Sequence, residues 1–302
     1  MYQRKCSPSQ INLYNKCPRS WWYKYKEKIK EPPTVALIKG SIVHSVIERF
    51  YKLDIRKSNI TKQNYITEFH EYSTSVLNDI LIEDRYVFGK PCQSFKNELQ
   101  NICNNDFTYA KEITDIRKII RNYINFFVVQ FEQYLDSTGN VPQSWYSLRP
   151  KFSELDLSFD RFVGYADSVI ENNDGLYVVD YKTSKIYKTG HSEDYRLQVN
   201  LYAFAYYKLY GIIPSVGIIH FLRYGRECVY DINKESVITD MENVITEFLD
   251  KTESNNIDDY PLNVNHIFCV CSLSKHKNKD WCYYKNRCDK AIENGTAVIM
   301  EE

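Results

Sequence analysis

The stretch from residue 164 to residue 202 constrains the fold more than any other part of the chain. Residues 161–170 (RFVGYADSVI) and the short apolar run 176–180 (LYVVD) predict two strands. The sequence NNDG at 172–175 is a strong turn signal between them, so the two strands form a hairpin. Residues 194–210 then have helical periodicity. A hairpin followed by a helix predicts a sheet with helices packed on it.

This hairpin brings two carboxylates and a lysine together. Asp167 and Asp180 project from neighbouring strands near one end, and Asp180 shares a face with Lys182 because strand side chains alternate. Two carboxylates suit Mg²⁺ or Mn²⁺, and a nearby lysine offsets phosphate charge and orients an attacking water. The pattern therefore indicates metal-assisted hydrolysis of a phosphodiester. For a lone Asp-x-Lys, the alternative is an ordinary strand end with a solvated ion pair.

Two helical segments carry further candidates. Residues 39–50 (KGSIVHSVIERF) predict a helix that starts near Gly40 and places His44 one turn in. A neutral imidazole can complete a metal site, although a packed or exposed helix histidine is the alternative. Gln198 and Tyr202 are four residues apart and share a helix face. An amide and a phenol can contact a phosphate and stack on a base.

These motifs and their order resemble the RecB-like branch of the PD-(D/E)XK nuclease superfamily. The matching residues are Gly40 and His44, Gly164 and Asp167, residues 180–183 (DYKT), and Gln198 and Tyr202. The resemblance implies that a Mg²⁺ or Mn²⁺ ion is bound by His44, Asp167, Asp180 and the backbone carbonyl of Tyr181. It also implies that Asp167, Asp180 and Lys182 are catalytic, and that Gln198 and Tyr202 hold the DNA strand.

Cysteine usage suggests a reducing compartment. The chain has nine cysteines, no apolar segment at its N-terminus and no apolar run of membrane-spanning length. An odd count without a secretory signal predicts a cytoplasmic protein whose thiols serve metal binding or packing, and no membrane partner.

Cys17 lies near one end of the chain, and Cys269, Cys271, Cys282 and Cys288 lie near the other. Four thiolates suit a [4Fe–4S] cluster or Zn²⁺.

The strings CPRSWWYKY and WCYYKNRC resemble RecB-like nucleases of the AddB and CRISPR-associated type, which bind an iron–sulfur cluster through one N-terminal and three C-terminal cysteines. The resemblance implies a cluster held by Cys17, Cys282, Cys288 and one further cysteine. The usual tail is Cys-x-x-Cys-x5-Cys, but position 279, where the first cysteine of that pattern would stand, is Lys279 here. We favour Cys269, which is nearer the preceding apolar segment, with Cys271 as the alternative ligand and zinc as the alternative metal.

Such a cluster would join residues 6–30 to residues 265–290 in a clasp. The loop that it closes is very long, but the entropy of loop closure grows only slowly with length. Residues 16–30 carry six basic residues against Glu27, interleaved with tryptophans and tyrosines. This mixture suits a groove for single-stranded nucleic acid. The alternative is a solvated basic face over a packed aromatic face. The net formal charge of zero indicates no partner by itself.

The remaining segments complete the predicted fold. Ser7, Pro8 and Gln10 form a capping box for a first helix. A helical insertion at about 53–150 follows, and its isoleucines and aromatics at 113–134 recur with a helical period. Residues 139–150 read as a connection into the sheet, and 154–159, 214–224 and 227–232 as strands, before a helix at 234–252. No GxxxxGK[ST] phosphate loop is present, so the chain has no motor of its own.

We therefore predict an α/β fold in one nuclease domain over residues 1–302: a mixed sheet flanked by helices, a catalytic core at about 151–232, a helical insertion and an iron–sulfur clasp. The predicted function is a metal-dependent DNA exonuclease that prefers single strands and acts in repair, recombination or CRISPR adaptation. The alternatives are a structure-specific flap endonuclease and a non-catalytic DNA-binding adaptor for a helicase or CRISPR integration partner. The three catalytic candidates are intact, which disfavours the adaptor.

Overall fold

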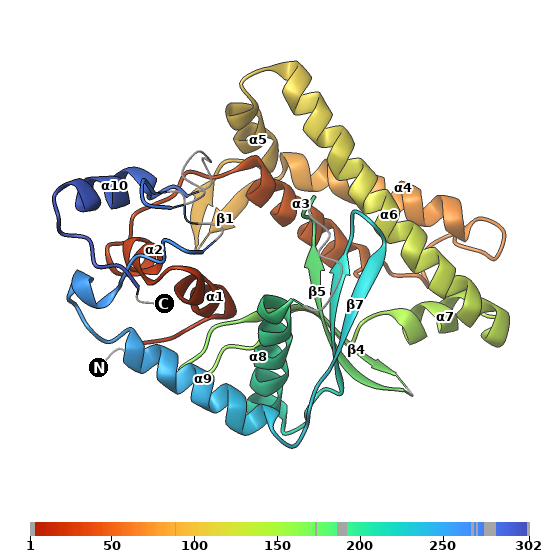
Figure 1. Ribbon diagram of the computed structural model, residues 1–302. Helices are drawn as coiled ribbons and strands as arrows, with labels where there is room; N and C mark the ends of the chain where they lie inside the picture. Colours follow the sequence, from red (N-terminus) through yellow and green to blue (C-terminus); the bar gives the residue numbers. More distant parts are fainter. Residues whose placement is uncertain are drawn as a thin grey trace. The chain divides into compact units, whose positions relative to one another are not determined.

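The computed structural model describes residues 4–87, 89–172, 174–185, 192–266, 269, 271–274 and 282–300. The chain forms two compact units. The terminal unit comprises Met1–Pro32, Ser158–Gly164 and Ile238–Glu302, and the sheet unit comprises Pro33–Leu157 and Tyr165–Val237. Figure 1 shows the helices and strands of each unit. That all 302 residues act as one nuclease domain stays a prediction.

A five-stranded mixed sheet forms the centre of the sheet unit. Its strands lie in the order β3 (Phe152–Asp156), β4 (Tyr165–Asn172), β5 (Gly175–Lys182), β6 (Val216–Phe221) and β7 (Arg226–Asp231). All neighbours are antiparallel except β5 and β6, whose parallel pairing needs the crossover helix α8 (Glu193–Tyr210). The predicted turn closes the β4–β5 hairpin, where Asn172 Oδ1 accepts the N–H of Gly175 at 3.2 Å. The mixed sheet is confirmed.

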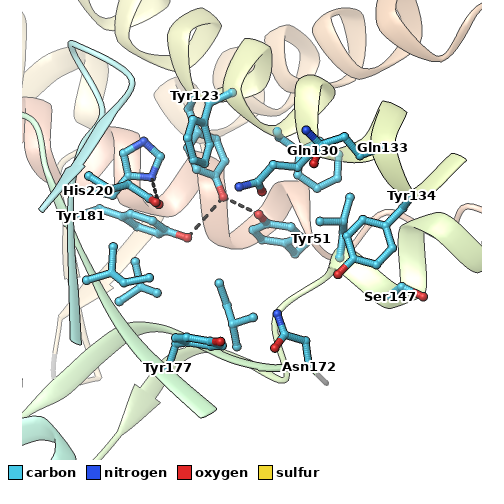
Figure 2. Close-up of a pocket in the computed structure, with 17 residues that line it drawn as sticks. Tyr51, Tyr123, Gln130, Gln133, Tyr134, Ser147, Asn172, Tyr177, Tyr181 and His220 are labelled. Atoms are coloured by element: carbon cyan, nitrogen blue, oxygen red, sulfur yellow. Dashed lines mark hydrogen bonds and ion pairs between the residues drawn. The ribbon is translucent and has the colours of Figure 1, made fainter. Parts of the chain in front are cut away.

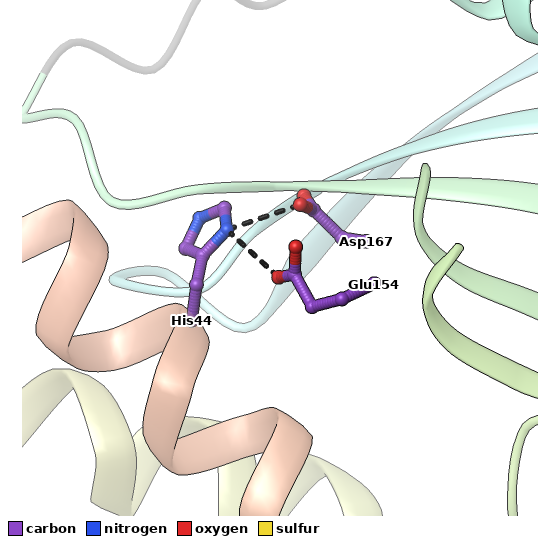
Figure 3. Close-up of side chains that lie close together, drawn as sticks. All are labelled: His44, Glu154 and Asp167. Carbon is purple, nitrogen blue, oxygen red and sulfur yellow. Dashed lines mark hydrogen bonds and ion pairs between the residues drawn. The ribbon is translucent and has the colours of Figure 1, made fainter. Parts of the chain in front are cut away.

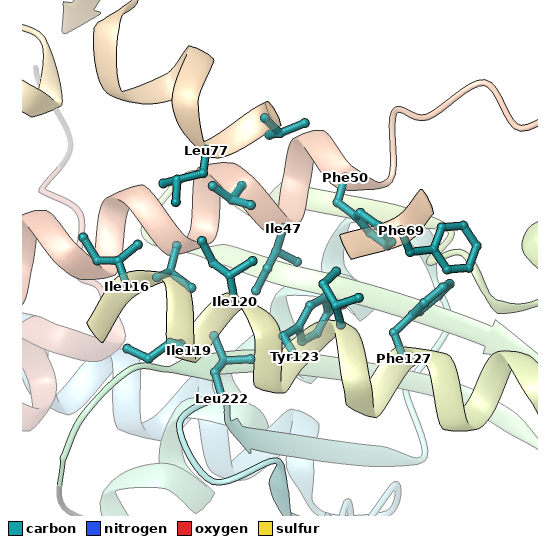
Figure 4. Packing of buried hydrophobic residues seen from close by; sticks show 14 of the residues in the cluster. Ile47, Phe50, Phe69, Leu77, Ile116, Ile119, Ile120, Tyr123, Phe127 and Leu222 are labelled. Carbon is teal, nitrogen blue, oxygen red and sulfur yellow. The ribbon is translucent and has the colours of Figure 1, made fainter. Parts of the chain in front are cut away.

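A group of helices packs together around one buried core, which also includes Val179 and Tyr181 of the sheet. The helices are α3 (Val35–Phe50), α4 (Tyr65–Ile82), α5 (Phe95–Cys103), α6 (Asp106–Thr138) and α7 (Val141–Leu148), and between α4 and α5 lies the small hairpin of β1 (Arg85–Val87) and β2 (Lys90–Cys92). The residues of α6 that recur with a helical period are buried from Ile113 to Phe131, as expected. Figure 4 shows this helix meeting Ile47 and Phe50 of α3 and Phe69 of α4. The insertion is thus predominantly helical.

Several sequence-based boundaries are wrong. The strand predicted from residue 161 begins at Tyr165, and the strand predicted to end at residue 159 ends at Asp156. Helix α3 begins at Val35 and not near Gly40, because Thr34 caps it by accepting the N–H of Leu37 at 3.2 Å. Residues 141–148 form α7 where a connection was expected. Asn140 caps α7 by accepting the N–H of Gln143 at 2.9 Å, and proline is tolerated in a first turn.

A buried ion network joins α3, α6 and the end of β6. Lys39 is only 4 % exposed and lies one residue before Gly40. Its Nζ is 2.5 Å from Asp115 Oδ2 and also contacts Glu112. Arg223 donates to both oxygens of Asp115, with Nη2 at 2.7 Å from Oδ2. This network holds the start of α3 against α6 and the sheet.

The terminal unit contains α1 (Pro8–Lys16), α2 (Pro18–Trp21), η1 (Trp22–Lys26), α9 (Val237–Lys251), η2 (Ile257–Asp259) and α10 (Lys285–Glu293). Ser7 caps α1 as predicted, but Gln10 Nε2 donates to the carbonyl of Lys5 and so does not complete the capping box. Trp21 stacks on Tyr260 with ring centroids 5.6 Å apart, and Trp22 is also buried. Trp21 and Trp22 therefore pack inside the unit, as the alternative interpretation expects, whereas Arg19 is buried rather than solvated. Binding of nucleic acid by residues 16–30 stays a prediction.

Within the part of the chain that the structure describes, no helix combines the length and the apolar character that crossing a membrane requires.

Candidate active site and cysteine cavity

Three ligand-type side chains, from α3, β3 and β4, meet at one point. His44 Nδ1 lies 3.0 Å from Asp167 Oδ1 and 3.7 Å from Glu154 Oε1 (Figure 3). One ligand atom from each of the three lies within 4.8 Å of those of the other two. Among the described residues, no other three histidine, cysteine or acidic side chains come together so closely. A helix and two strands thus present one imidazole and two carboxylates to a common point.

The electrostatics of these groups favour a cation. Burial raises the pKa of Asp167, the charge of Asp180 raises it further, and a hydrogen bond from His44 partly offsets both. Burial lowers the pKa of His44, but its hydrogen bonds to Asp167 and Glu154 outweigh this effect and raise its pKa to about 10. A divalent cation would stabilise the ionised carboxylates at this point. The donor set of oxygens and one imidazole nitrogen fits Mg²⁺ or Mn²⁺.

The carboxylate of Asp180 contacts both the catalytic candidate Lys182 and the side-chain amide of Gln198. Asp180 Oδ2 lies 2.6 Å from Lys182 Nζ, and Gln198 Nε2 donates to Asp180 Oδ1 at 2.6 Å. Lys182 Nζ also donates to Gln198 Oε1 at 3.2 Å. Burial lowers the pKa of Lys182, but the charge of Asp180 outweighs it and raises the pKa above the ordinary value. The sequence correctly predicted that Asp180 and Lys182 share a face.

Gln198 and Tyr202 face this site from α8, as the four-residue spacing predicted. Gln198 Nε2 donates to the hydroxyl of Tyr202 at 3.0 Å, and Tyr202 is almost fully buried. In this arrangement the tyrosine supports the glutamine, which in turn bridges Asp180 and Lys182. Their contact with a DNA strand stays a prediction.

Tyr181 turns its side chain away from the carboxylates. Its backbone N–H donates to Asp167 Oδ2 at 2.5 Å, which joins β5 to the metal-ligand group. Its ring lines a cavity of about 240 Å³ between α6 and the sheet, where a chain of hydroxyls runs from Tyr51 through Tyr123 to Tyr181 (Figure 2). This chain fixes the ring of Tyr181. The role of the Tyr181 carbonyl as a metal ligand stays a prediction.

Glu154 is a site residue that the sequence did not single out. It lies in β3 between the pairs Ser153–Ser168 and Leu155–Ala166, so it stands opposite Asp167. Its φ of 50° is in the left-handed region, which a glutamate in a strand rarely adopts. Such an outlier is typical of functional sites. Only the strand register could have revealed this residue.

A wide cavity of about 730 Å³ surrounds His44 and includes Gly40, Glu154, Lys182 and Thr183 among its lining residues. A Cβ on Gly40 would lie 3.6 Å from Thr183 Oγ1, so these two motif residues are neighbours. Two apolar side chains stand exposed in the wall: Tyr165 is 51 % and Leu37 is 64 % exposed. The sequence had not indicated either of them.

A separate cavity in the terminal unit is lined by five cysteines. Its volume is about 240 Å³, and the cysteines are Cys17, Cys269, Cys271, Cys282 and Cys288. The Sγ atoms of Cys269 and Cys271 are 3.4 Å apart, and Cys282 Sγ lies 3.9 Å from the hydroxyl of Ser20 in α2. The structure therefore brings all five candidate ligands to one place.

Contacts between residues 23–31 and residues 284–287 join the two ends of the chain beside this cavity. Tyr284 donates to Glu31 at 2.8 Å, its ring lies 5.4 Å from that of Tyr23, and Arg287 pairs with Glu27 at 3.3 Å. The predicted association of residues 6–30 with the tail is thus present, and the cluster itself stays a prediction.

The spacing of the thiols bears on which metal they suit. Four sulfurs bound to one zinc lie about 3.8 Å apart, given Zn–S bonds of about 2.3 Å in a tetrahedron. In the described chain, no three cysteine sulfurs gather within 4.8 Å of one another. The thiolates of an iron–sulfur cluster bind different irons and so stand farther apart. Among the described residues the thiols do not form a group as tight as a tetrahedral zinc site, and the metal that they hold stays a prediction.

Comparison with known proteins agrees with the geometry of the sheet unit. The family model described as the PD-(D/E)XK nuclease superfamily matches residues 5–289. The search among curated proteins found no match. The match spans both units and includes every residue of the candidate active site. On this sequence match, which covers nearly its whole length, the chain belongs to the PD-(D/E)XK nuclease superfamily.

Proposed function

We propose that this protein is a Mg²⁺- or Mn²⁺-dependent DNA exonuclease that prefers single strands, of the RecB-like iron–sulfur type. Membership of the superfamily indicates a metal-dependent nuclease that acts on DNA. The observation that carries the proposal is the meeting of His44, Glu154 and Asp167, whose ligand atoms lie within 4.8 Å of one another. The charge of Asp180 acts on both His44 and Asp167, and Lys182 is held 2.6 Å from Asp180. This combination supplies metal ligands and a positioned cation in one place.

Each residue has a distinct role in the proposed reaction. His44, Asp167, Asp180 and the carbonyl of Tyr181 hold the metal, and Glu154 adds a carboxylate to them. When bound, the divalent ion neutralises phosphate charge and activates a water. Lys182 orients the attacking water and offsets charge that develops on the phosphate. Gln198 holds the carboxylate of Asp180 and the ammonium of Lys182 in register.

The surroundings of the metal ligands suit an unpaired strand. Tyr165, two residues before Asp167, lies exposed in the wall of the 730 Å³ cavity, and Leu37 extends the apolar surface. Bases that are not paired can stack on an exposed aromatic ring, with a gain of about 1–3 kcal/mol per base. We propose that Tyr165 takes this part, and that Gln198, supported by the buried Tyr202, contacts the strand from α8.

In the terminal unit we propose a [4Fe–4S] cluster held by Cys17, Cys282, Cys288 and one of Cys269 and Cys271. The support is the convergence of five thiols on one cavity. The cluster would fasten the N-terminal helices to the tail. Zinc is the alternative occupant, which metal analysis would distinguish.

The biological role, the partner proteins and the cellular compartment are part of the same proposal. The resemblance to AddB-type and CRISPR-associated nucleases supports a role in DNA repair, recombination or CRISPR adaptation, beside a helicase or CRISPR integration proteins. All nine cysteines are among the described residues and none forms a disulfide, which supports a reducing cytoplasm.

Cleavage assays with four substrates test the activity. End-labelled linear single strands, linear duplexes, flapped duplexes and closed circular single strands are incubated with Mn²⁺ or with excess EDTA. We expect Mn²⁺-dependent loss of the linear single strand and an intact circle. Cutting of the circle, or at the base of the flap, would identify an endonuclease instead.

A matched pair of variants ties this activity to the site. Asp180→Ala removes one metal ligand and should abolish cleavage while DNA binding persists. Asp174→Ala changes an exposed aspartate in the hairpin turn and should leave the rate unchanged. Wild-type cleavage in excess chelator, or full activity of Asp180→Ala, would contradict the proposed metal site.

A further inference from the structure

We propose that the cavity between α6 and the sheet is a binding site for a neutral nucleobase, either free as a nucleoside or carried by a DNA strand. The cavity has a volume of about 240 Å³ and includes Tyr123, Gln130, Tyr177 and His220 among its lining residues (Figure 2). All its lining residues belong to the sheet unit. Neither the proposed nuclease activity nor the thiols of the terminal unit enter into this assignment.

The cavity lies on the face of β5 opposite to the proposed catalytic residues. Val179 and Tyr181 line it with their side chains. Because strand side chains alternate, Asp180 and Lys182 point to the other face of the sheet. A ligand in this cavity therefore occupies a site of its own, separate from the metal ligands.

The size of the cavity suits a single compact ring system. Pockets for drug-sized ligands have volumes of about 300–1,000 Å³, and this cavity is smaller, at about 240 Å³. A nucleobase is a flat ligand of this size class. Its sugar can extend past Gln133, which lines the cavity and is exposed.

Aromatic rings form much of the cavity wall. Tyr123, Phe126, Tyr134 and Tyr177 are among its lining residues, and the last two are only partly buried. Bases stack on the rings of tyrosine and phenylalanine, whichever base it is, because every base has a π-face. The wall therefore favours a flat aromatic ligand over an aliphatic one.

Unpaired hydrogen-bonding groups accompany these rings. Four side chains that line the cavity have no hydrogen-bond partner within the described part of the chain: Gln130, Gln133, Tyr134 and Tyr177. An amide offers both a donor and an acceptor, which is the combination that pairs with the edge of a base. A base in the cavity can satisfy several of these groups at once.

The charges at the cavity disfavour a phosphate. Among the described residues that line it, none is a lysine or an arginine, and Glu227 is the single acidic one. His220 is 2 % exposed and neutral at neutral pH, because burial lowers its pKa to about 4. Its Nδ1 lies 3.4 Å from Glu227 Oε1, and its buried Nε2 has no hydrogen-bond partner among the described residues. A neutral base with N–H donors fits these groups, whereas an anion would meet a carboxylate without a cation.

Fluorescence titration with 2-aminopurine riboside tests the site, since stacking on an aromatic ring quenches this fluorescent base. The wild type is compared with Gln130→Leu, which removes an amide, and with Ser147→Trp, which places a large ring in the cavity from an exposed position on α7. Gln143→Leu, exposed on α7 and outside the cavity, is the matched control. Adenosine and AMP compete with the probe, all in excess EDTA, and circular dichroism identifies the folded variants.

In the wild type we expect saturable quenching that adenosine reverses, with AMP about 10-fold weaker as a competitor. Gln130→Leu should weaken binding of the probe about 10-fold, as the loss of a hydrogen bond in a desolvated site implies. Ser147→Trp should abolish saturable quenching, and Gln143→Leu should match the wild type. No saturable quenching in the wild type, equal competition by AMP, or unchanged affinity in a folded Gln130→Leu or Ser147→Trp would overturn the proposal.

A DNA single strand that carries one 2-aminopurine, titrated in the same excess of EDTA, identifies the source of the base. Quenching of the strand that Ser147→Trp removes would show that the cavity takes a base from DNA. Strand fluorescence that Ser147→Trp leaves unchanged, together with lost binding of the free riboside, would show that it takes a free nucleoside. Either result supports the site.

Discussion

Lys182 is held between an acid and an amide, so its ammonium group has little freedom. It pairs with Asp180 and donates to Gln198. Because its proposed interaction strengthens only as charge develops on the phosphate, Lys182→Ala should lower kcat by about 10²–10³-fold and change the Kd for DNA far less. Single-turnover kinetics and equilibrium binding measure the two effects. Weak binding with near-normal turnover would reassign Lys182 to a ground-state phosphate contact.

Glu154 faces the same imidazole as Asp167. If its carboxylate is a metal ligand, Glu154→Gln should raise the Mn²⁺ concentration for half-maximal cleavage by about 10–100-fold, and saturating metal should restore most of kcat. A Mn²⁺ titration of the rate measures this. Glu171→Gln, at the exposed end of β4, is the matched control. An unchanged titration for Glu154→Gln would leave His44 and the two aspartates as the metal-binding residues.

At the scale of elements, the ion network of α3 and α6 positions His44 from a distance. The guanidinium of Arg223, together with the ammonium of Lys39, holds the pKa of Asp115 well below its usual range. Asp115→Asn takes the acid partner from the partly buried Arg223 and one of two carboxylates from the buried Lys39, which keeps Glu112. We expect it to lower the free energy of unfolding by about 3 kcal/mol. Urea denaturation at neutral pH measures the loss. Asp136→Asn, exposed on the same helix, should have little effect.

The low pKa of Asp115 also predicts how the free energy of unfolding depends on pH. A carboxyl group with a depressed pKa in the folded state stabilises the protein fully above its unfolded pKa of about 3.9, and this contribution falls as the pH drops below that value. The difference in unfolding free energy between wild type and Asp115→Asn should therefore be constant from pH 7 to about 5 and shrink below pH 4. A difference that grows on acidification would contradict this account.

At the scale of the whole molecule, the two ends of the chain share one cavity. Cys17→Ser should remove iron and visible absorption and lower the unfolding temperature by several degrees, because a group that binds only the folded state adds its binding energy to stability. Iron analysis and thermal unfolding measure both effects. Cys228→Ser, a partly buried cysteine in β7, should keep iron and stability. Equal stability of Cys17→Ser and wild type would show that the packed aromatic side chains suffice.

Sequence alone determined the features that depend on local periodicity. The turn at 172–175 predicted the hairpin, strand alternation placed Asp180 and Lys182 on one face, and helical spacing aligned Gln198 with Tyr202. The buried residues of α6 were predictable for the same reason. These features follow from backbone geometry, which nearby residues specify.

Tertiary structure decided what depends on residues far apart in the chain. Strand register brought Glu154 opposite Asp167, and packing turned Tyr202 into a buried support for Gln198. The tryptophans near Cys17 became core because Tyr260 stacks on one of them. The cavity gathered the five candidate thiols from both ends of the chain. Periodicity cannot specify such contacts, because each depends on how separate elements pack against one another.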